Sequence, residues 1–254
     1  MSRSPFAFFR RRAPVQPRAP LPDGMRVYAI GDIHGRLDCM LMMESAIRRD
    51  LQNRGAADRT LVVFLGDYID RGPDSRAIIN VLLQGRFATL PARFLMGNHE
   101  DAMLRFLDDP AIGPAWFNHG GMATLASYGV RPSGTDGANR MEQLRQGLID
   151  VLPPEHLAFL QSLELSIELG GFLFVHAGIR PGKALADQRR DDLLTIRDAF
   201  FAAKGLPWRV VHGHTVFEKP VIGIDRISLD TGAYASGILT CAVIEGDQVS
   251  ILTS

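Results

Sequence analysis

The sequence predicts an α/β fold, because strand and helix patterns alternate along the first hundred residues. Three short apolar runs, at residues 25–30, 61–65 and 92–96, each end at a glycine, as expected of buried strands. Helical spacing of apolar residues occupies the intervals 36–53 and 75–87. A strand–helix–strand order favours parallel pairing, so we expect these three strands to form one buried, parallel sheet.

The helix expected at 36–53 needs an apolar face that can pack on this sheet. Its expected inward residues are Leu37, Met40, Leu41, Ala46 and Ile47. Residues 100–163 are also mostly helical in pattern, with breaks at prolines and glycines. We predict that they form a helical insertion beside the sheet rather than a separate domain.

Strand patterns return from residue 165. Residues 165–169 and 172–175 flank Gly170-Gly171, which predicts a hairpin with a tight turn. A helix is expected near 191–203. The remaining strands are expected at 209–212, 220–229, 238–244 and 248–252. Together these segments predict a second, more antiparallel sheet.

Composition excludes several classes of protein. The chain has 254 residues, is 46% hydrophobic and 22% charged, and has 28 basic and 28 acidic side chains. A nucleic-acid binder needs an excess of cations facing the phosphates, which this balance does not provide. No apolar run approaches the roughly 18 residues that a transmembrane helix requires. The chain has enough apolar material for one large core.

Cys39 and Cys241 are too few for a disulfide scaffold. We expect two buried thiols in a reducing, cytoplasmic location, with a disulfide between them as the alternative.

Residues 1–22 differ from the rest of the chain. They carry five arginines, five prolines and no acidic residue. No apolar stretch of about 7 residues follows the charges, so we do not expect a secretory signal. The segment is expected to be a disordered basic arm, with a tether to an anionic membrane surface or an acidic partner as the alternative.

Polar clusters follow directly after the three expected parallel strands. They are Gly31-Asp32-Ile33-His34-Gly35, Gly66-Asp67-Tyr68-Ile69-Asp70-Arg71-Gly72 and Gly97-Asn98-His99-Glu100. Two later strands end in Val175-His176-Ala177-Gly178 and Val211-His212-Gly213-His214-Thr215. Because ligands bind beyond the carboxyl ends of parallel strands, we expect these clusters to converge on one crevice.

The side chains of these clusters form a mixed oxygen and nitrogen donor set. Its members are Asp32, His34, Asp67, Asp70, Asn98, His99, His176, His212 and His214. They are too many for one metal ion, but two ions bridged by a shared carboxylate would use them. Such a site suits phosphoester hydrolysis, and the forked guanidinium of Arg71 suits phosphate oxygens. A single aspartate after a strand is often only a helix cap, but five clusters at strand ends are not explained that way.

The motifs GDIHG, GDYIDRGP, GNHE, VHAG and GHT resemble the signature of the metal-dependent phosphoprotein phosphatases. These are the serine/threonine phosphatases of the calcineurin-like metallophosphoesterase superfamily. The motifs stand in the family's order from Asp32 to Thr215, and the stretches 120–129 and 193–197 resemble its bacterial branch. The resemblance implies a sandwich of two mixed β-sheets flanked by helices, as one catalytic domain over residues 23–254.

The same resemblance implies two divalent metal ions. The ligands that it implies are Asp32, His34 and Asp67 for the first ion, and Asp67, Asn98, His176 and His214 for the second. Asp67 would then bridge the two ions. We expect Mn²⁺, with Fe or Zn as alternatives, because ligand type alone does not choose between them.

Four further residues receive roles from the resemblance. His99 resembles the general acid that protonates the leaving alkoxide, and Asp70 the carboxylate that orients it. Arg71 and Arg197 resemble two phosphate-binding arginines. For Arg197, a surface arginine on a helix is the alternative.

Several residues keep two interpretations. His212 lies two positions before His214, so both would face one side of a strand and His212 would support the site. Asp230 either orients a metal-binding histidine or belongs to a turn. Trp116 is expected to be a core residue, with a substrate platform as the alternative. His156 is expected at the surface.

The predicted function is hydrolysis of phosphoserine and phosphothreonine in proteins, by direct attack of a metal-bridging hydroxide. A phosphoprotein or phosphopeptide is the expected partner, and the oligomeric state is left open. One alternative is a nucleotide hydrolase of the symmetrical diadenosine tetraphosphatase type, which shares GDIHG and GNH. Those enzymes typically lack the carboxylate at the Asp70 position and favour aspartate at that of Glu100. A second alternative is a catalytically inactive module that binds phosphopeptides.

Overall fold

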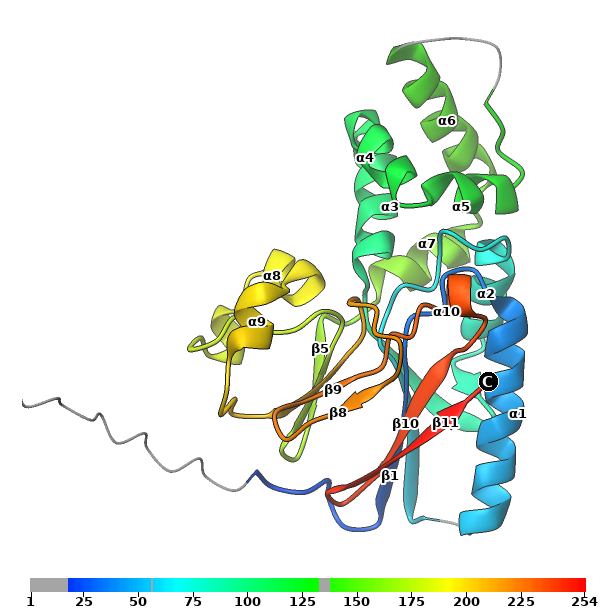
Figure 1. The fold of residues 1–254 in the computed structure, drawn as a ribbon. Helices are drawn as coiled ribbons and strands as arrows, with labels where there is room; N and C mark the ends of the chain where they lie inside the picture. The colour runs from blue at the N-terminus through cyan, green and yellow to red at the C-terminus, as the bar shows by residue number, and fades with distance from the viewer. Residues whose placement is uncertain (1–17, 56, 133–137) are drawn as a thin grey trace, which may run out of the picture.

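The computed structural model describes residues 18–55, 57–132 and 138–254, which form two β-sheets packed face to face between helices (Figure 1). This arrangement confirms the predicted α/β sandwich. No helix among the described residues is both long enough and apolar enough to cross a membrane.

The first sheet has the strand order β11-β10-β1-β2-β4-β3. Its parallel centre, as predicted, consists of β1 (Met25–Ile30), β2 (Arg59–Phe64) and β4 (Leu90–Phe94). Its antiparallel edges are β3 (Arg86–Phe87) on one side and β10 (Thr240–Glu245) with β11 (Gln248–Thr253) on the other.

The second sheet has the order β5-β6-β7-β9-β8. Its strands are β5 (Ser166–Leu169), β6 (Phe172–Val175), β7 (Arg209–His212), β8 (Val221–Ile222) and β9 (Arg226–Ser228). The hairpin of β5 and β6 is antiparallel, as predicted, whereas β6, β7 and β9 run parallel. The segment 220–229 is two strands and not one, because the chain turns between β8 and β9 at Gly223.

The prediction that the last two strands belong to the second sheet is wrong. β10 pairs with β1 in the first sheet, and it is buried on both faces. Cys241 and Val243 face the helices, while Ala242 and Ile244 lie between the sheets. A strand that is apolar on both faces needs cover on both sides, which β10 has inside the sandwich.

Alternation along β1 shows how the layers form. Tyr28 and Ile30 pack against the helices, whereas Val27 and Ala29 pack against the second sheet. Successive side chains of a strand point to opposite faces, so one six-residue segment contributes to two cores.

Helix α1 (Leu37–Arg54) lies along the outer face of the first sheet (Figure 1). Met40, Ala46 and Ile47 are buried and Leu37 is partly buried, as predicted, but Leu41 is 45% exposed. Cys39 and Met43 complete the buried stripe instead. Each residue advances a helix by about 100°, so Leu41 is carried past the edge of the stripe that contains Met40.

Two predicted helices are shorter than expected. Helix α2 (Ser75–Leu82) stops before residue 87, because Gly85 adopts the left-handed conformation, φ 65°, and residues 86–87 form β3. The helix expected near 191–203 is divided into α8 (Arg190–Thr195) and α9 (Asp198–Ala202). The break falls at Arg197, whose backbone is not helical, with φ −133° and ψ −91°.

The predicted helical insertion lies above the carboxyl ends of the parallel strands (Figure 1). It consists of α3 (Asn98–Asp108), η1 (Pro110–Ile112), α4 (Gly113–Asn118), α5 (Gly121–Ser127), α6 (Ala138–Val151) and α7 (Pro154–Gln161). Two short elements complete the described chain, η2 (Leu185–Asp187) and α10 (Ala233–Ser236).

Residues 1–17 of the predicted disordered tail lie outside the described residues. The boundary expected at residue 22 is wrong, because the chain already packs on the sandwich from Arg18. Leu21 is buried between the sheets, and Nε of Arg18 donates to the carbonyl of Leu206 at 3.0 Å. Burial of the apolar Leu21 side chain lowers the free energy of the folded chain, and this outweighs the tendency to disorder that the charge and prolines of these few residues indicate.

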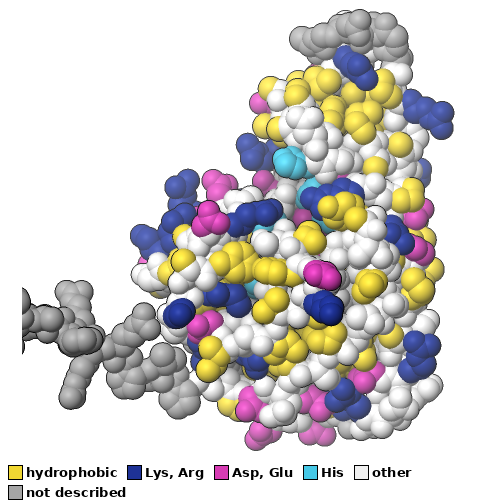
Figure 2. Space-filling view, in the orientation of Figure 1, with side chains coloured by type: hydrophobic (Ala, Val, Ile, Leu, Met, Phe, Trp, Pro, Cys, Tyr) yellow, Lys and Arg dark blue, Asp and Glu magenta, His cyan; other side chains and the backbone are white. Residues whose placement is uncertain are grey.

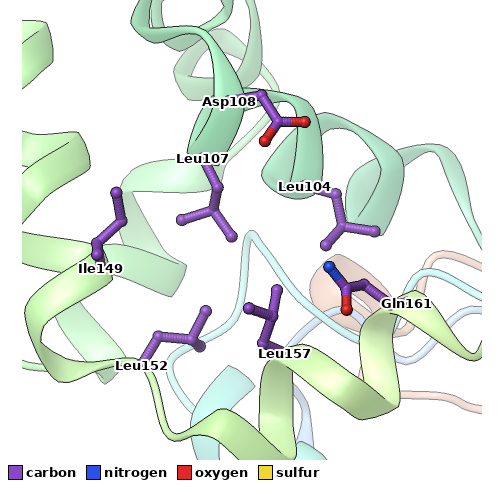
Figure 3. Close-up of a pocket in the computed structure, with 7 residues that line it drawn as sticks. All are labelled: Leu104, Leu107, Asp108, Ile149, Leu152, Leu157 and Gln161. Atoms are coloured by element: carbon purple, nitrogen blue, oxygen red, sulfur yellow. The ribbon is translucent and has the colours of Figure 1, made fainter.

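Leucine side chains from α3 and α7 point into a cavity of about 340 Å³ within the helical insertion (Figure 3). Its lining residues are Leu104, Leu107, Asp108, Ile149, Leu152, Leu157 and Gln161. It contains none of the predicted metal ligands, so it is separate from the crevice at the strand ends.

Candidate active site

The polar clusters converge at the edge of the sandwich below the helical insertion. In Figure 2, histidine side chains lie in the recess between the insertion and the sheets, with Lys and Arg side chains beside them. Two groups of side chains there place their ligand atoms within 4.8 Å of one another, His34–Asp67–His99 and Asp67–His176–His214. Asp67 belongs to both groups, as a bridging carboxylate must.

Strained backbone marks the same place. Seven described non-glycine residues have positive φ, and five of them belong to the polar clusters. The five are His34, Asp67, Asp70, Arg71 and His214. Residues other than glycine rarely adopt this backbone conformation. Each instance costs roughly 1–3 kcal/mol, so the surrounding structure must enforce it. Strain of this kind gathers at sites where side chains are held for a task.

Asp67 stands at the centre of the site. Its Oδ2 atom lies 3.5 Å from Nε2 of His34, 3.5 Å from Nε2 of His176 and 3.8 Å from Nε2 of His99. Burial works to raise the pKa of Asp67, but the surrounding histidines outweigh it, so the pKa lies well below its usual value. The carboxylate is therefore ionised and can act as a ligand.

The tautomers of two histidines follow from their partners. Nδ1 of His34 lies 2.9 Å from the carbonyl of Ile69, and Nδ1 of His176 lies 2.8 Å from the carbonyl of Leu65. A carbonyl oxygen only accepts, so each Nδ1 donates its hydrogen and each Nε2 presents a lone pair. This arrangement is the usual support for a metal-binding histidine.

Asn98 lies between two of the predicted ligands. Its Oδ1 atom lies 3.0 Å from Nε2 of His176 and 2.8 Å from Nδ1 of His214. Burial lowers the pKa of His34 and of His214 to about 3, so both imidazoles are neutral. Neutral imidazole is the form that binds metal ions.

Asp32 shows most directly that these residues fit a cation. Its Oδ2 atom accepts from the backbone N–H of His214 at 2.9 Å, whereas its buried Oδ1 atom has no hydrogen-bond partner. A Cβ atom at Gly213 would lie 1.9 Å from that Oδ1, so only glycine allows the carboxylate this position. Burial, with the nearby charges of Asp230 and Asp67, raises the pKa of Asp32, and a cation would offset that penalty.

His99, a member of the first group, forms a hydrogen-bonded pair with Asp70. Nδ1 of His99 lies 2.6 Å from Oδ2 of Asp70, and both side chains are buried. Oδ2 also accepts from the indole N–H of Trp116 at 2.7 Å, and Oδ1 accepts from the hydroxyl of Thr124 at 2.5 Å. Trp116 is therefore buried as predicted, and its polar edge also supports the site.

The pKa of His99 is raised. Burial works against the charged imidazolium, but the charge of Asp67 and the hydrogen-bonded Asp70 outweigh it. With Nδ1 bonded to Asp70, a proton that the ring transfers leaves from Nε2, which faces Asp67. The pair can therefore deliver a proton to an atom bound there.

The two predicted arginines both reach the site. Nη2 of Arg71 lies 3.4 Å from Nε2 of His99. Nε of Arg197 donates to Nε2 of His214 at 3.2 Å, although Arg197 itself is exposed. The break between α8 and α9 explains this reach, because it turns Arg197 out of a helical path.

Glu100 is buried and organises the loops of the site, which the sequence analysis did not foresee. Its carboxylate accepts from the backbone N–H groups of Asp67, Tyr68, Ile69 and Gly97, at 2.8–3.2 Å. Its position next to His99 in the motif was the available signal. These four bonds hold the loop after β2 against the start of α3.

The structure places two residues for which the sequence left two interpretations open. His212 is not in either ligand group, because its imidazole lies between Ser228 Oγ and the carbonyl of Gly213. Asp230 is a turn residue, whose Oδ1 accepts from the N–H of Gly232 at 2.9 Å. Among the described contacts, no histidine donates to Asp230.

The prediction that His156 lies at the surface is wrong. Its imidazole is buried between the hydroxyl of Tyr128, at 2.8 Å, and Oδ1 of Asn80, at 2.9 Å. These partners come from α2 and from the end of α5, distant parts of the chain. Nothing within the local pattern of α7 indicates a buried polar network of this kind.

A small pocket of about 170 Å³ opens beside the pair of His99 and Asp70. Its lining residues are Asn98, His99, Ala102, Arg105, Ile112, Ala115, Trp116 and His119. They all come from α3, η1 and α4 or the residue after them, so the helical insertion forms one wall of the site.

The chain has relatives over most of its length. An asymmetrical bis(5'-nucleosyl)-tetraphosphatase PrpE of Bacillus thuringiensis (strain Al Hakam) is 27% identical over 237 residues, which cover 85% of this chain and 89% of that protein. A protein of the same name from Bacillus anthracis (strain A0248) has the same identity and coverage.

Solved structures share the fold. A putative diadenosine tetraphosphatase superposes with a TM-score of 0.61 at 19% identity, and covers 90% of this chain and 93% of its own. A cold-active protein-tyrosine phosphatase of a psychrophile Shewanella species superposes with a TM-score of 0.55 at 16% identity, covering 92% and 83%.

A family profile matches residues 25–236, the region that contains all the polar clusters. Its description is calcineurin-like phosphoesterase. The chain therefore belongs to the calcineurin-like phosphoesterases, hydrolases that use a dinuclear divalent metal centre, for which it has suitable His and Asp groups.

Proposed function

We propose that this protein is a metal-dependent phosphomonoesterase that removes phosphate from phosphoserine and phosphothreonine in proteins. The observation that carries the proposal is the buried pair of His99 and Asp70, 2.6 Å apart, beside the shared carboxylate of Asp67. A serine or threonine alkoxide is a poor leaving group and requires protonation as it departs. A leaving phosphate from a phosphoanhydride is far more acidic and gains much less from a general acid.

In this proposal the predicted ligands hold two cations, which we expect to be Mn²⁺. Asp32, His34 and Asp67 would hold one, and Asp67, Asn98, His176 and His214 the other. When bound, the cations activate water and neutralise charge on the phosphate. Asp32, His34, Asp67 and His176 are buried, which limits competition from bulk water for these contacts.

The chain's own residues carry the remaining steps. Arg71 and Arg197 bind phosphate oxygens, and their guanidinium groups approach the site from two sides. Nε2 of His99 gives its proton to the leaving oxygen, while Asp70 holds the imidazolium in place. Trp116 and Thr124 hold Asp70, so that the proton donor has one orientation.

A second candidate is hydrolysis of dinucleoside tetraphosphates. The names of the Bacillus relatives favour it, at 27% identity over most of both chains. The same ligand groups would serve this reaction, with Arg71 and Arg197 on the polyphosphate. It differs from the first candidate in its leaving group, which depends little on His99.

One comparison separates the two candidates. Metal-stripped protein is reconstituted with Mn²⁺, and phosphate release from phosphothreonine peptides is compared with turnover of diadenosine tetraphosphate. Faster turnover of the peptides, with a large loss in the His99→Asn variant, supports the phosphoprotein proposal. Faster turnover of the dinucleotide, with little loss in that variant, overturns it in favour of the second candidate.

A further inference from the structure

Arg71 is not held by a carboxylate among the residues that the structure describes, because no acidic group there lies within ion-pair distance of its guanidinium. Its backbone is in the left-handed region, φ 66°, and its N–H donates to the carbonyl of Gly120. The guanidinium lies instead over the ring of Tyr234, with Cζ 4.4 Å from the ring centroid.

Tyr234 is held where it can support this contact. It lies on α10, a single turn flanked by Gly232 and Gly237, which both have positive φ. Nη1 of Arg36 donates to the carbonyl of Ala233 at 2.8 Å, which ties α10 to the start of α1. The ring also lies edge-on to the imidazole of His34, with 5.6 Å between centroids.

The exposure of the ring is consistent with a role at the mouth of the site. Tyr234 is 40% exposed, although it contacts His34 and Arg71, which belong to the site. A tyrosine that served only the core would be covered. Its ring therefore forms part of the surface that an incoming substrate meets.

An aromatic face can position an arginine without reducing its ability to bind phosphate. A free arginine side chain loses about 2 kcal/mol of rotamer entropy when it becomes fixed. A carboxylate partner would fix it but would occupy its N–H groups and cancel its charge. A ring face contacts the flat face of the guanidinium, so the N–H donors in its plane stay available.

We propose that Tyr234 is a positioning residue, whose ring holds the guanidinium of Arg71 in the orientation that binds phosphate oxygens. This inference rests on the phosphate-binding role proposed above for Arg71. It adds a residue from α10 to a site formed by the strand ends, the helical insertion and Arg197.

The test compares Tyr234→Phe, Tyr234→Leu and Tyr234→Ala in the Mn²⁺-loaded protein. The measurements are kcat and KM for p-nitrophenyl phosphate, and the Kd of inorganic phosphate by calorimetry. We expect the Leu and Ala variants to raise KM and the phosphate Kd by about 3- to 30-fold, the range of a cation–π contact. The Phe variant keeps the ring face and should stay close to the wild type.

Variants of Arg71 distinguish a failure of this inference from a failure of the proposed role of Arg71. If Tyr234 acts through Arg71, Arg71→Ala and the double variant Arg71→Ala/Tyr234→Ala should bind phosphate equally weakly. An additional loss in the double variant would show that the tyrosine acts independently, and would overturn the inference. If Arg71→Ala binds phosphate as the wild type does, the proposed role of Arg71 fails first.

A matched control addresses folding. Ile238→Ala changes an exposed aliphatic residue just after α10. This residue has no aromatic ring to contact Arg71, so the substitution should leave phosphate binding unchanged. Should Tyr234→Ala fail to fold, the Phe and Leu variants give the same comparison of ring against aliphatic side chain. Equal phosphate Kd values for these two variants would overturn the inference.

Discussion

Nδ1 of His99 lies 2.6 Å from Oδ2 of Asp70, although the two residues follow different strands of the first sheet. His99 begins α3 after β4, and Asp70 lies in the loop after β2. β2 and β4 are parallel neighbours, so their carboxyl ends meet at one edge. The proton donor of the proposed reaction is therefore assembled by strand order.

His99→Asn removes this proton donor. We expect turnover of phosphoserine peptides to fall by about 10²- to 10⁴-fold. Turnover of aryl phosphates should fall far less, because a phenolate departs without protonation. Steady-state kinetics on a phosphopeptide and on p-nitrophenyl phosphate measure the difference. Equal losses on both substrates would show that His99 is not the acid.

Asp70→Asn tests the pH dependence of the same pair. The charge of Asp70 raises the pKa of His99, so its removal lowers that pKa. An acid must be protonated to act, and activity on phosphoserine peptides is lost as pH rises through its pKa. The alkaline limb of the pH–rate profile should therefore move to lower pH in this variant. A limb that stays in place would separate Asp70 from the titrating group.

Asp67→Asn weakens the carboxylate that both ligand groups share. We expect turnover to be nearly abolished and metal content to fall, because the amide presents less charge to two cations. Metal analysis by mass spectrometry and the phosphatase assay check both effects. Wild-type turnover with two bound metals would refute the bridging role.

Glu100→Gln changes the acceptor of four backbone N–H groups. One oxygen becomes an amide nitrogen, which leaves two buried donors without a partner at roughly 1–3 kcal/mol each. The free energy of unfolding should fall accordingly, as measured by denaturant titration. Glu142→Gln, which alters a partly exposed surface pair with Arg145, is the control and should change little. An equal change in the free energy of unfolding in both variants would show that Glu100 does not organise the loops.

Removal of metal should lower thermal stability. A ligand that binds only the folded protein stabilises it by about 2.7 kcal/mol at one hundred times its Kd. For a chain of this size that is a fall in Tm of roughly 5–10 °C on chelation. Differential scanning fluorimetry with and without EDTA measures it. The double variant Asp67→Asn/His176→Asn should lose this response, and a persistent response would place the stabilising metal elsewhere.

The three parallel strands and the convergence of their polar clusters were predictable, because both depend on residues that are neighbours in the sequence. The runs that become β1, β2 and β4 are apolar enough to be recognised as strands, and each ends at a glycine before a polar cluster. Parallel order then brings Asp32, Asp67 and Asn98 to one edge. The candidate site was accessible from the sequence for that reason.

Other features depend on contacts between distant segments. Three such contacts are the pairing of β10 with β1, the burial of His156 against Asn80, and the ring of Tyr234 under Arg71. The paired residues are 76 to more than 200 positions apart in the sequence. Local propensity carries no signal for such pairs, because their free energy arises only when both partners are buried together. The sequence alone therefore determined the strands, the motifs and their convergence. Tertiary packing decided which sheet each strand joined and which side chains contact His99 and Arg71, the proposed proton donor and phosphate-binding arginine.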